Sequence, residues 1–168
     1  MKFIGLLAVI GSCLGIGWIK INAVRLEIRT MDALLRGVRV IRSELSGRLC
    51  PMRELLLLAA AEAGEDCDFF LVCADRMEEL NRKSFSSIWS ETCRSCLKGL
   101  SEENLRTTDS LGSTLGRYEM DVQLAACDRY LRSCEQSLKE LRYRLPEQRR
   151  LTLALSSATG IFLCLLIL

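Results

Sequence analysis

The sequence predicts an all-α protein, an antiparallel cytoplasmic helical bundle between an N-terminal and a C-terminal transmembrane helix. Three observations lead to this fold class. The 168-residue chain has only two prolines, apolar residues recur at helical spacing through its middle, and no stretch alternates with the period of two that marks a half-buried strand. The hydrophobic residues gather at the two ends, where two apolar segments lie.

The first element is the apolar segment at residues 3–19, bounded by Lys2 and Lys20. Its length is close to the minimum of about 17 residues for a membrane span. A secretory signal peptide also has a basic start and an apolar core, but this run is long for such a core and lacks a small-x-small cleavage site. Trp18 near its end is typical of a membrane interface. We expect a retained transmembrane helix over residues 1–21.

The last element, residues 151–168, carries no charge and predicts a second transmembrane helix over residues 149–168. Basic residues flank the inner ends of both spans: Lys20, Arg25, Arg29, Arg142, Arg144, Arg149 and Arg150. Positive charge of this kind marks the cytoplasmic side of a membrane. The sequence therefore predicts a multi-pass protein of the cell membrane with a cytoplasmic helical bundle at residues 22–148.

Within the bundle, a long amphipathic helix is expected to continue from the first span and to end at Gly47. Pro51 suits the first turn of a second helix, which Gly64 closes. Three shorter helices follow, with the expected N-caps Asp68, Ser84 or Ser86, and Ser101. The first of the three should run through Lys83, and the second should carry Trp89 and end at Gly99.

The final helix is predicted by an unbroken 4-3 spacing of apolar residues over residues 120–145, with Pro146 as a kink or boundary at the membrane surface. Such a stripe is either the core of an intramolecular bundle or the seam of an intermolecular coiled coil. We prefer the bundle core because several other amphipathic helices need a partner.

The amino-acid composition argues against several classes of function. Lys and Arg total 23 against 21 Asp and Glu, a net charge of +2 that does not favour binding of nucleic acid. The absence of histidine removes Ser-His-Asp and Cys-His triads and every zinc site that needs imidazole. The cysteine count of nine is odd, and a lone Cys93-x-x-Cys96 is more typical of buried apolar positions than of a redox or metal site. We therefore expect no enzyme activity, no cofactor and no metal.

One short motif, LGSTLGRYEMDVQ at residues 111–123, has two glycines four residues apart. It lacks the GxxxxGK[ST] of a phosphate-binding loop and the GxGxxG of a dinucleotide-binding turn. We expect a helix to end at Gly112 and the chain to reverse through Gly116 with a positive φ. Glu119 should complement the dipole of the next helix, and Gln123 should reach back toward the turn. The motif is predicted to be a hinge between helices.

The segment around this motif resembles the stage III sporulation protein AB family of endospore-forming Firmicutes. The features that carry the resemblance are an aromatic-x-x-x-Trp stretch, the Leu-Gly-x-x-Leu-Gly unit, and a following acidic residue and glutamine: Phe85, Trp89, Leu111, Gly112, Leu115, Gly116, Glu119 and Gln123. The resemblance extends over nearly the whole chain. One departure is Tyr118-Glu119, where the family usually has Ser-Asp, and Glu is a poorer N-cap than Ser or Asp.

The resemblance implies a place in the channel between mother cell and forespore. The family's helical bundle is similar to the cytoplasmic domains of the inner-membrane platform protein of type II secretion and type IV pilus machines. The implied partners are a secretion-type ATPase encoded nearby and other stage III sporulation channel membrane proteins, in the mother-cell membrane around the forespore.

Three classes of function are open to such a chain. The first is a non-catalytic membrane platform or adaptor, which the resemblance favours. The second is a membrane-tethered dimerising or sensory helical module, a homo-oligomer joined along the stripe at residues 120–145. A membrane enzyme comes last because the sequence offers no histidine and no metal constellation.

Overall fold

The computed structural model describes the backbone of residues 2–47, 50–116 and 119–167, and side chains over 21–47, 50–80, 82–116 and 119–143. The chain divides into two compact units, one of residues 1–26 with 140–168 and one of residues 27–139. The described elements are α1 (Lys2–Gly47), α2 (Met52–Ala63), α3 (Phe69–Asp75), α4 (Phe85–Cys96), α5 (Glu102–Thr114) and α6 (Met120–Ile167), with two 3₁₀ segments, η1 (Gly64–Asp66) and η2 (Arg76–Asn81). These described ranges contain helices and no strand, which confirms the all-α fold class.

The first unit consists of the N-terminal part of α1 and the C-terminal part of α6. The backbone of α6 continues past Pro146, so the prediction of a helix boundary there was wrong. Where side chains are described, no helix has both the length and the apolar character that a membrane crossing requires. The predicted spans at residues 1–21 and 149–168 lie outside those side chains, apart from Ile21. The spans and the boundaries of the bundle at residues 22–148 remain predictions.

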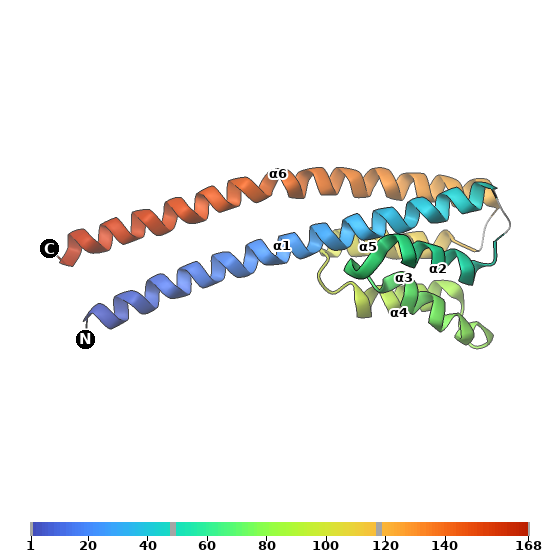
Figure 1. The fold of residues 1–168 in the computed structure, drawn as a ribbon, viewed down its shortest axis with the longest axis horizontal. Helices are drawn as coiled ribbons and strands as arrows, with labels where there is room; N and C mark the ends of the chain where they lie inside the picture. Colours follow the sequence, from blue (N-terminus) through green and yellow to red (C-terminus); the bar gives the residue numbers. More distant parts are fainter. Residues whose placement is uncertain (1, 48–49, 117–118, 168) are drawn as a thin grey trace. The chain divides into compact units, whose positions relative to one another are not determined.

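The second unit holds α2 to α5 beside the C-terminal part of α1 and the N-terminal part of α6 (Figure 1). Local signals in the sequence set several element ends as predicted. α1 ends at Gly47, α2 begins directly after Pro51, and Gly64 follows α2 with φ +71°. Ser84 caps α4, since its hydroxyl accepts a hydrogen bond from the Ser87 N–H at 3.2 Å.

The predicted ends of the third and fourth helices were wrong. The third helix stops at Asp75 and the chain continues as the 3₁₀ segment η2, in which residues i and i+3 eclipse and Arg76 pairs with Glu79 at 2.9 Å. Asp68 precedes α3, but its side chain makes no capping hydrogen bond. α4 ends at Cys96, before Gly99.

The N-terminus of α5 is capped by a residue far away in the sequence. Ser101 occupies the predicted N-cap position, but its hydroxyl makes no capping bond. Instead the Glu27 carboxylate of α1 accepts hydrogen bonds from the Ser101 N–H at 2.8 Å and from Asn104 Nδ2 at 2.9 Å. Glu27 is buried, and a carboxylate at a helix N-terminus is favoured by the helix dipole.

A second long-range cap joins α1 to α2. The Arg36 guanidinium donates to the last carbonyls of α2, to Glu62 O at 3.1 Å and Ala63 O at 2.7 Å. These carbonyls have no partner within their own helix, and a cation is favoured at a helix C-terminus. α1 thereby holds both the end of α2 and the start of α5.

The stripe along α6 is partly buried inside this chain. Cys127, Cys134 and Leu138 are in the core, while Met120 is exposed. The packing face also includes Tyr130, which the 4-3 pattern did not contain. Burial within one chain agrees with the interpretation of the stripe as bundle core. Ion pairs of Arg39 with Glu135 (2.6 Å) and of Arg42 with Asp128 show that α1 and α6 run antiparallel in this unit.

Candidate functional site

Trp89 of α4 is the centre of the region that the family motif marks. Its side chain is fully buried, and its ring meets Phe69 edge-on, with ring centroids 4.7 Å apart. The ring of Phe85 lies 5.7 Å away. The indole N–H donates to the Thr108 carbonyl of α5 at 2.9 Å. The hydrogen bond satisfies the one polar group of a large apolar side chain, as buried tryptophans require.

Gly112 lies within α5 and not at its end, so the prediction that it terminates a helix was wrong. α5 continues to Thr114. The absence of a side chain at Gly112 serves a close approach between helices, because a Cβ at this position would lie 2.1 Å from Trp89 Cδ1. The indole ring therefore packs directly against the backbone of α5.

Gly116 makes the predicted turn. Its φ is +75°, in the left-handed region that favours glycine. The predicted role of Gln123 is also confirmed, since its Oε1 accepts a hydrogen bond from the Gly116 N–H at 3.1 Å. The side chain of the first turn of α6 thus closes the connection that leads into it.

Glu119 contributes differently from the prediction. It precedes α6, and the acidic residue in the first turn of that helix is Asp121. The Glu119 backbone carbonyl accepts from the N–H groups of Val122 (3.1 Å) and Gln123 (3.2 Å). Its side chain is exposed. The structure therefore gives Glu119 a backbone role at the start of α6.

The remaining motif residues, Leu111 and Leu115, are both buried. The motif thus brings together two aromatic side chains, two leucines, two glycines and an amide, with no nucleophile and no charge among the buried groups. Among the described residues, no buried side-chain nitrogen or oxygen lacks a hydrogen-bond partner. The arrangement can hold α4, α5 and α6 in one geometry, and its buried groups include none that could act in catalysis.

Sequence reasoning missed Thr108, which links the same three helices. Its carbonyl accepts from Trp89 of α4, and its hydroxyl lies 3.2 Å from the hydroxyl of Tyr130 of α6. Burial raises the pKa of the Tyr130 phenol well above its ordinary value. The phenol therefore stays neutral. A buried Trp and a buried Tyr each need a polar partner, which is the signal that could have found Thr108.

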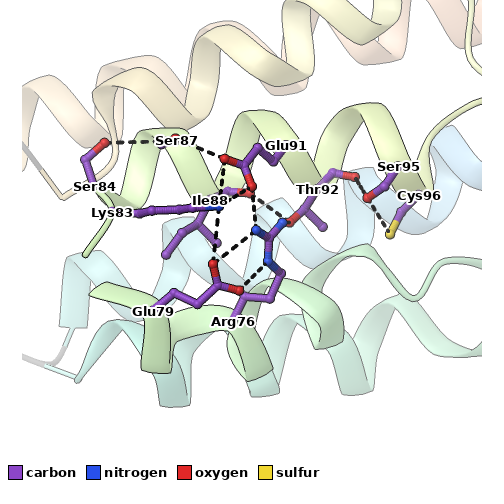
Figure 2. A network of polar contacts seen from close by, with 10 residues as sticks. All are labelled: Arg76, Glu79, Lys83, Ser84, Ser87, Ile88, Glu91, Thr92, Ser95 and Cys96. Atoms are coloured by element: carbon purple, nitrogen blue, oxygen red, sulfur yellow. Dashed lines mark hydrogen bonds and ion pairs between the residues drawn. The ribbon is translucent and has the colours of Figure 1, made fainter. Parts of the chain in front are cut away.

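A charged cluster joins η2 to α4 on the same unit (Figure 2). Arg76 pairs with Glu79 at 2.9 Å and with Glu91 at 2.5 Å, and Lys83 pairs with Glu91 at 2.7 Å. The hydrogen bonds from Lys83 and Arg76 lower the pKa of Glu91 to about 2. The same hydrogen bonds hold η2, which replaces the predicted end of the third helix, against α4.

The cysteines of the bundle differ in exposure. Cys93 is buried and Cys96 is exposed on the same helix, and the described cysteines are free thiols. Burial raises the pKa of Cys73 to about 12 and those of Cys67, Cys127 and Cys134 to about 11. A thiol with a raised pKa is a poor nucleophile and a poor metal ligand. Among the described side chains, no group of three or more potential metal ligands lies together.

Comparison with known proteins gives two findings. The profile of the family described as "Stage III sporulation protein AB (spore_III_AB)" matches residues 2–168. A solved structure titled "Stage III sporulation protein AB (SpoIIIAB)" is similar with a TM-score of 0.63 and 16% sequence identity, over 72% of this chain and 97% of that one. At that identity the likeness is one of fold. No curated protein sequence matches.

Proposed function

Since the chain belongs to the stage III sporulation protein AB family, which supports a role in sporulation, we propose that it is a non-catalytic platform or adaptor subunit of the mother cell–forespore channel complex. The family is not a known enzyme class. The observation that carries the proposal is the match of the family profile over residues 2–168.

The packing of the motif residues supports a scaffold. Trp89, Leu111 and Leu115 are buried, Gly112 is in direct contact with the indole, and Gly116 turns the chain. All of these side chains and backbone groups lie where α4, α5 and α6 pack together or where the chain turns toward α6. A rigid helical unit with a satisfied interior is suited to present surfaces to partners.

The proposed partners are a secretion-type ATPase encoded nearby and other stage III sporulation channel membrane proteins. We place the chain in the mother-cell membrane around the forespore, with the central bundle in the cytoplasm, on the basis of the basic residues that flank the apolar segments. In that location a cytoplasmic ATPase can reach the bundle. Assembly with further copies of the chain is not needed to bury Cys127, Cys134 and Leu138 of the α6 stripe, because these residues are already covered.

Binding of the full chain to the purified ATPase tests the proposal. The chain, in lipid nanodiscs, is immobilised and titrated with the ATPase, and we expect saturable binding. Nanodiscs that hold an unrelated two-span protein are the control. Equal signals from the two, with a chain that circular dichroism shows to be helical, would contradict ATPase docking.

A further inference from the structure

A groove of about 410 Å³ lies between α5 and α6. Its buried floor is formed by Leu111, Ala126 and Tyr130. Serine and threonine side chains of α5 form one rim, and Arg129 of α6 stands on the other. No acidic residue is among the residues that line it. Because Leu111 belongs to the family motif and the Tyr130 hydroxyl is held by Thr108, the floor is built on the packed junction of α4, α5 and α6.

Three of the four hydroxyl groups that α5 contributes to the lining donate to backbone carbonyls of their own helix. Thr107 donates to the Glu103 carbonyl at 2.9 Å, Ser110 to the Thr107 carbonyl at 2.8 Å, and Ser113 to the Ser110 carbonyl at 2.7 Å. The oxygens of these three groups can still accept hydrogen bonds. An occupant that carries donors can therefore bond to Thr107, Ser110 and Ser113.

Arg129, on the other rim, is a hydrogen-bond donor and needs an acceptor. Its side chain is exposed, and within the part of the chain that the structure describes it joins no ion pair. A guanidinium is a donor with a planar fork that matches a carboxylate. A small inorganic anion would satisfy Arg129, but it would bring no donor to the three α5 hydroxyls and no apolar group to the buried floor. A polypeptide carries both N–H donors and carboxylates, so it can satisfy both sides at once.

We infer that the groove between α5 and α6 binds an acidic segment of a partner protein, whose carboxylate pairs with Arg129 while an apolar side chain lies on Leu111 and Tyr130. The inference rests on the proposed function only in that the chain has a protein partner. It does not depend on which partner that is.

A peptide selection tests the inference. The full chain in lipid nanodiscs is panned against a random peptide library displayed on phage, and the same library is panned in parallel on the variants Arg129→Gln and Arg132→Gln. Arg132 is exposed on the same helix, outside the groove lining, so its substitution removes the same charge as a matched control. Circular dichroism melting confirms that each variant is folded.

The expected result is enrichment of peptides with Asp or Glu beside an apolar residue on the wild-type chain and on Arg132→Gln, and loss of this enrichment on Arg129→Gln. An enriched peptide should bind about tenfold or more weakly to Arg129→Gln, the typical effect of losing one charge-assisted hydrogen bond. Absence of acidic enrichment, or equal losses at Arg129 and Arg132, would overturn the inference.

A second pair of variants tests the location without changing charge. Ser110→Leu places a larger side chain at the rim and should weaken binding of the enriched peptide. Ser46→Leu is the control, because Ser46 is an exposed helix serine with the same bond to the carbonyl three residues earlier, 2.7 Å at Ser43 O. Unchanged binding to Ser110→Leu would place the peptide elsewhere and overturn the inference. Failure of the ATPase to bind, with peptide selection as expected, would contradict the proposed function alone.

Discussion

Single residues of the Leu-Gly motif show that two glycines of one motif are present for different physical reasons. Gly112 leaves space for the Trp89 ring, which a Cβ would approach to 2.1 Å. At Gly116 an added Cβ would make only an ordinary van der Waals contact, 3.5 Å from Met52 Cε, but the φ of +75° is unfavourable for other residues. Side-chain packing requires glycine at position 112, and the backbone conformation requires it at position 116.

Gly112→Ala is expected to destabilise the fold through crowding. The new Cβ must displace the buried Trp89 ring and with it the hydrogen bond to the Thr108 carbonyl. Overpacking of this kind costs about 1–3 kcal/mol, against a gain of roughly 1 kcal/mol from the helix propensity of alanine. Urea denaturation followed by circular dichroism measures the balance. Gly47→Ala, where an added Cβ meets nothing within 4 Å, is the control and should not destabilise.

Gly116→Ala is expected to destabilise by about 1–2 kcal/mol, the cost of the left-handed conformation for a residue with a Cβ. Gly116→Val should cost more because its side chain is branched at Cβ. Gly116→Asn should cost least of the three, since asparagine tolerates this region. The same denaturation experiment gives the ranking. Three equal free energies of unfolding would contradict a requirement for positive φ at this position.

At the scale of elements, the ion pairs of Arg76 and Lys83 with Glu91 hold η2 against α4 (Figure 2). The pKa of Glu91 falls from its ordinary 4.5 to about 2 in the folded protein. The folded state therefore binds fewer protons, and the contribution to stability is full above about pH 4.5 and is lost as the pH falls toward 2. The pKa of Glu79 is lowered in the same direction by Arg76.

Glu91→Gln is accordingly expected to lower the free energy of unfolding at pH 7, with a difference from the wild type that shrinks as the pH drops through 4.5 toward 2. Urea denaturation over this pH series measures it. Because the pairs are solvent-exposed, high salt should reduce the difference at pH 7. A difference that stays constant across the pH series would show that the substitution acts through packing and not through the charge of Glu91.

For the whole molecule, the proposed topology has the two apolar end segments crossing the membrane. The two-span proposal places both termini on the side opposite the bundle. A reporter that is active only in the cytoplasm should be silent when fused after Leu168 and active when inserted at Gly64, an exposed turn residue. An active C-terminal fusion would rule out the two-span topology.

Element ends that depend on the local backbone were predictable from the sequence. Pro51 starts α2, Gly64 follows it with a positive φ, Ser84 caps α4, and Gly116 turns the chain toward α6. In each case the signal is a property of one residue, a restricted φ, a permitted φ or a short polar side chain. Such signals act within a few residues, so they can be recognised without knowledge of the fold.

The all-α class, most helix ends, the Gly116 turn and the hydrogen bond from the Gly116 N–H to Gln123 therefore follow from the sequence itself. Only the tertiary structure decided that Gly112 makes room for Trp89, that Glu27 of α1 caps α5, that Arg36 of α1 caps α2, and that the segment after Asp75 becomes a 3₁₀ turn. Glu27 and Ser101 are 74 residues apart, and Arg36 and Ala63 are 27 apart. These groups meet because burial of the apolar faces brings their helices together, and hydrophobic burial is non-directional. Helical periodicity shows which face is buried, but which side chains then satisfy each helix end is determined only when the helices pack.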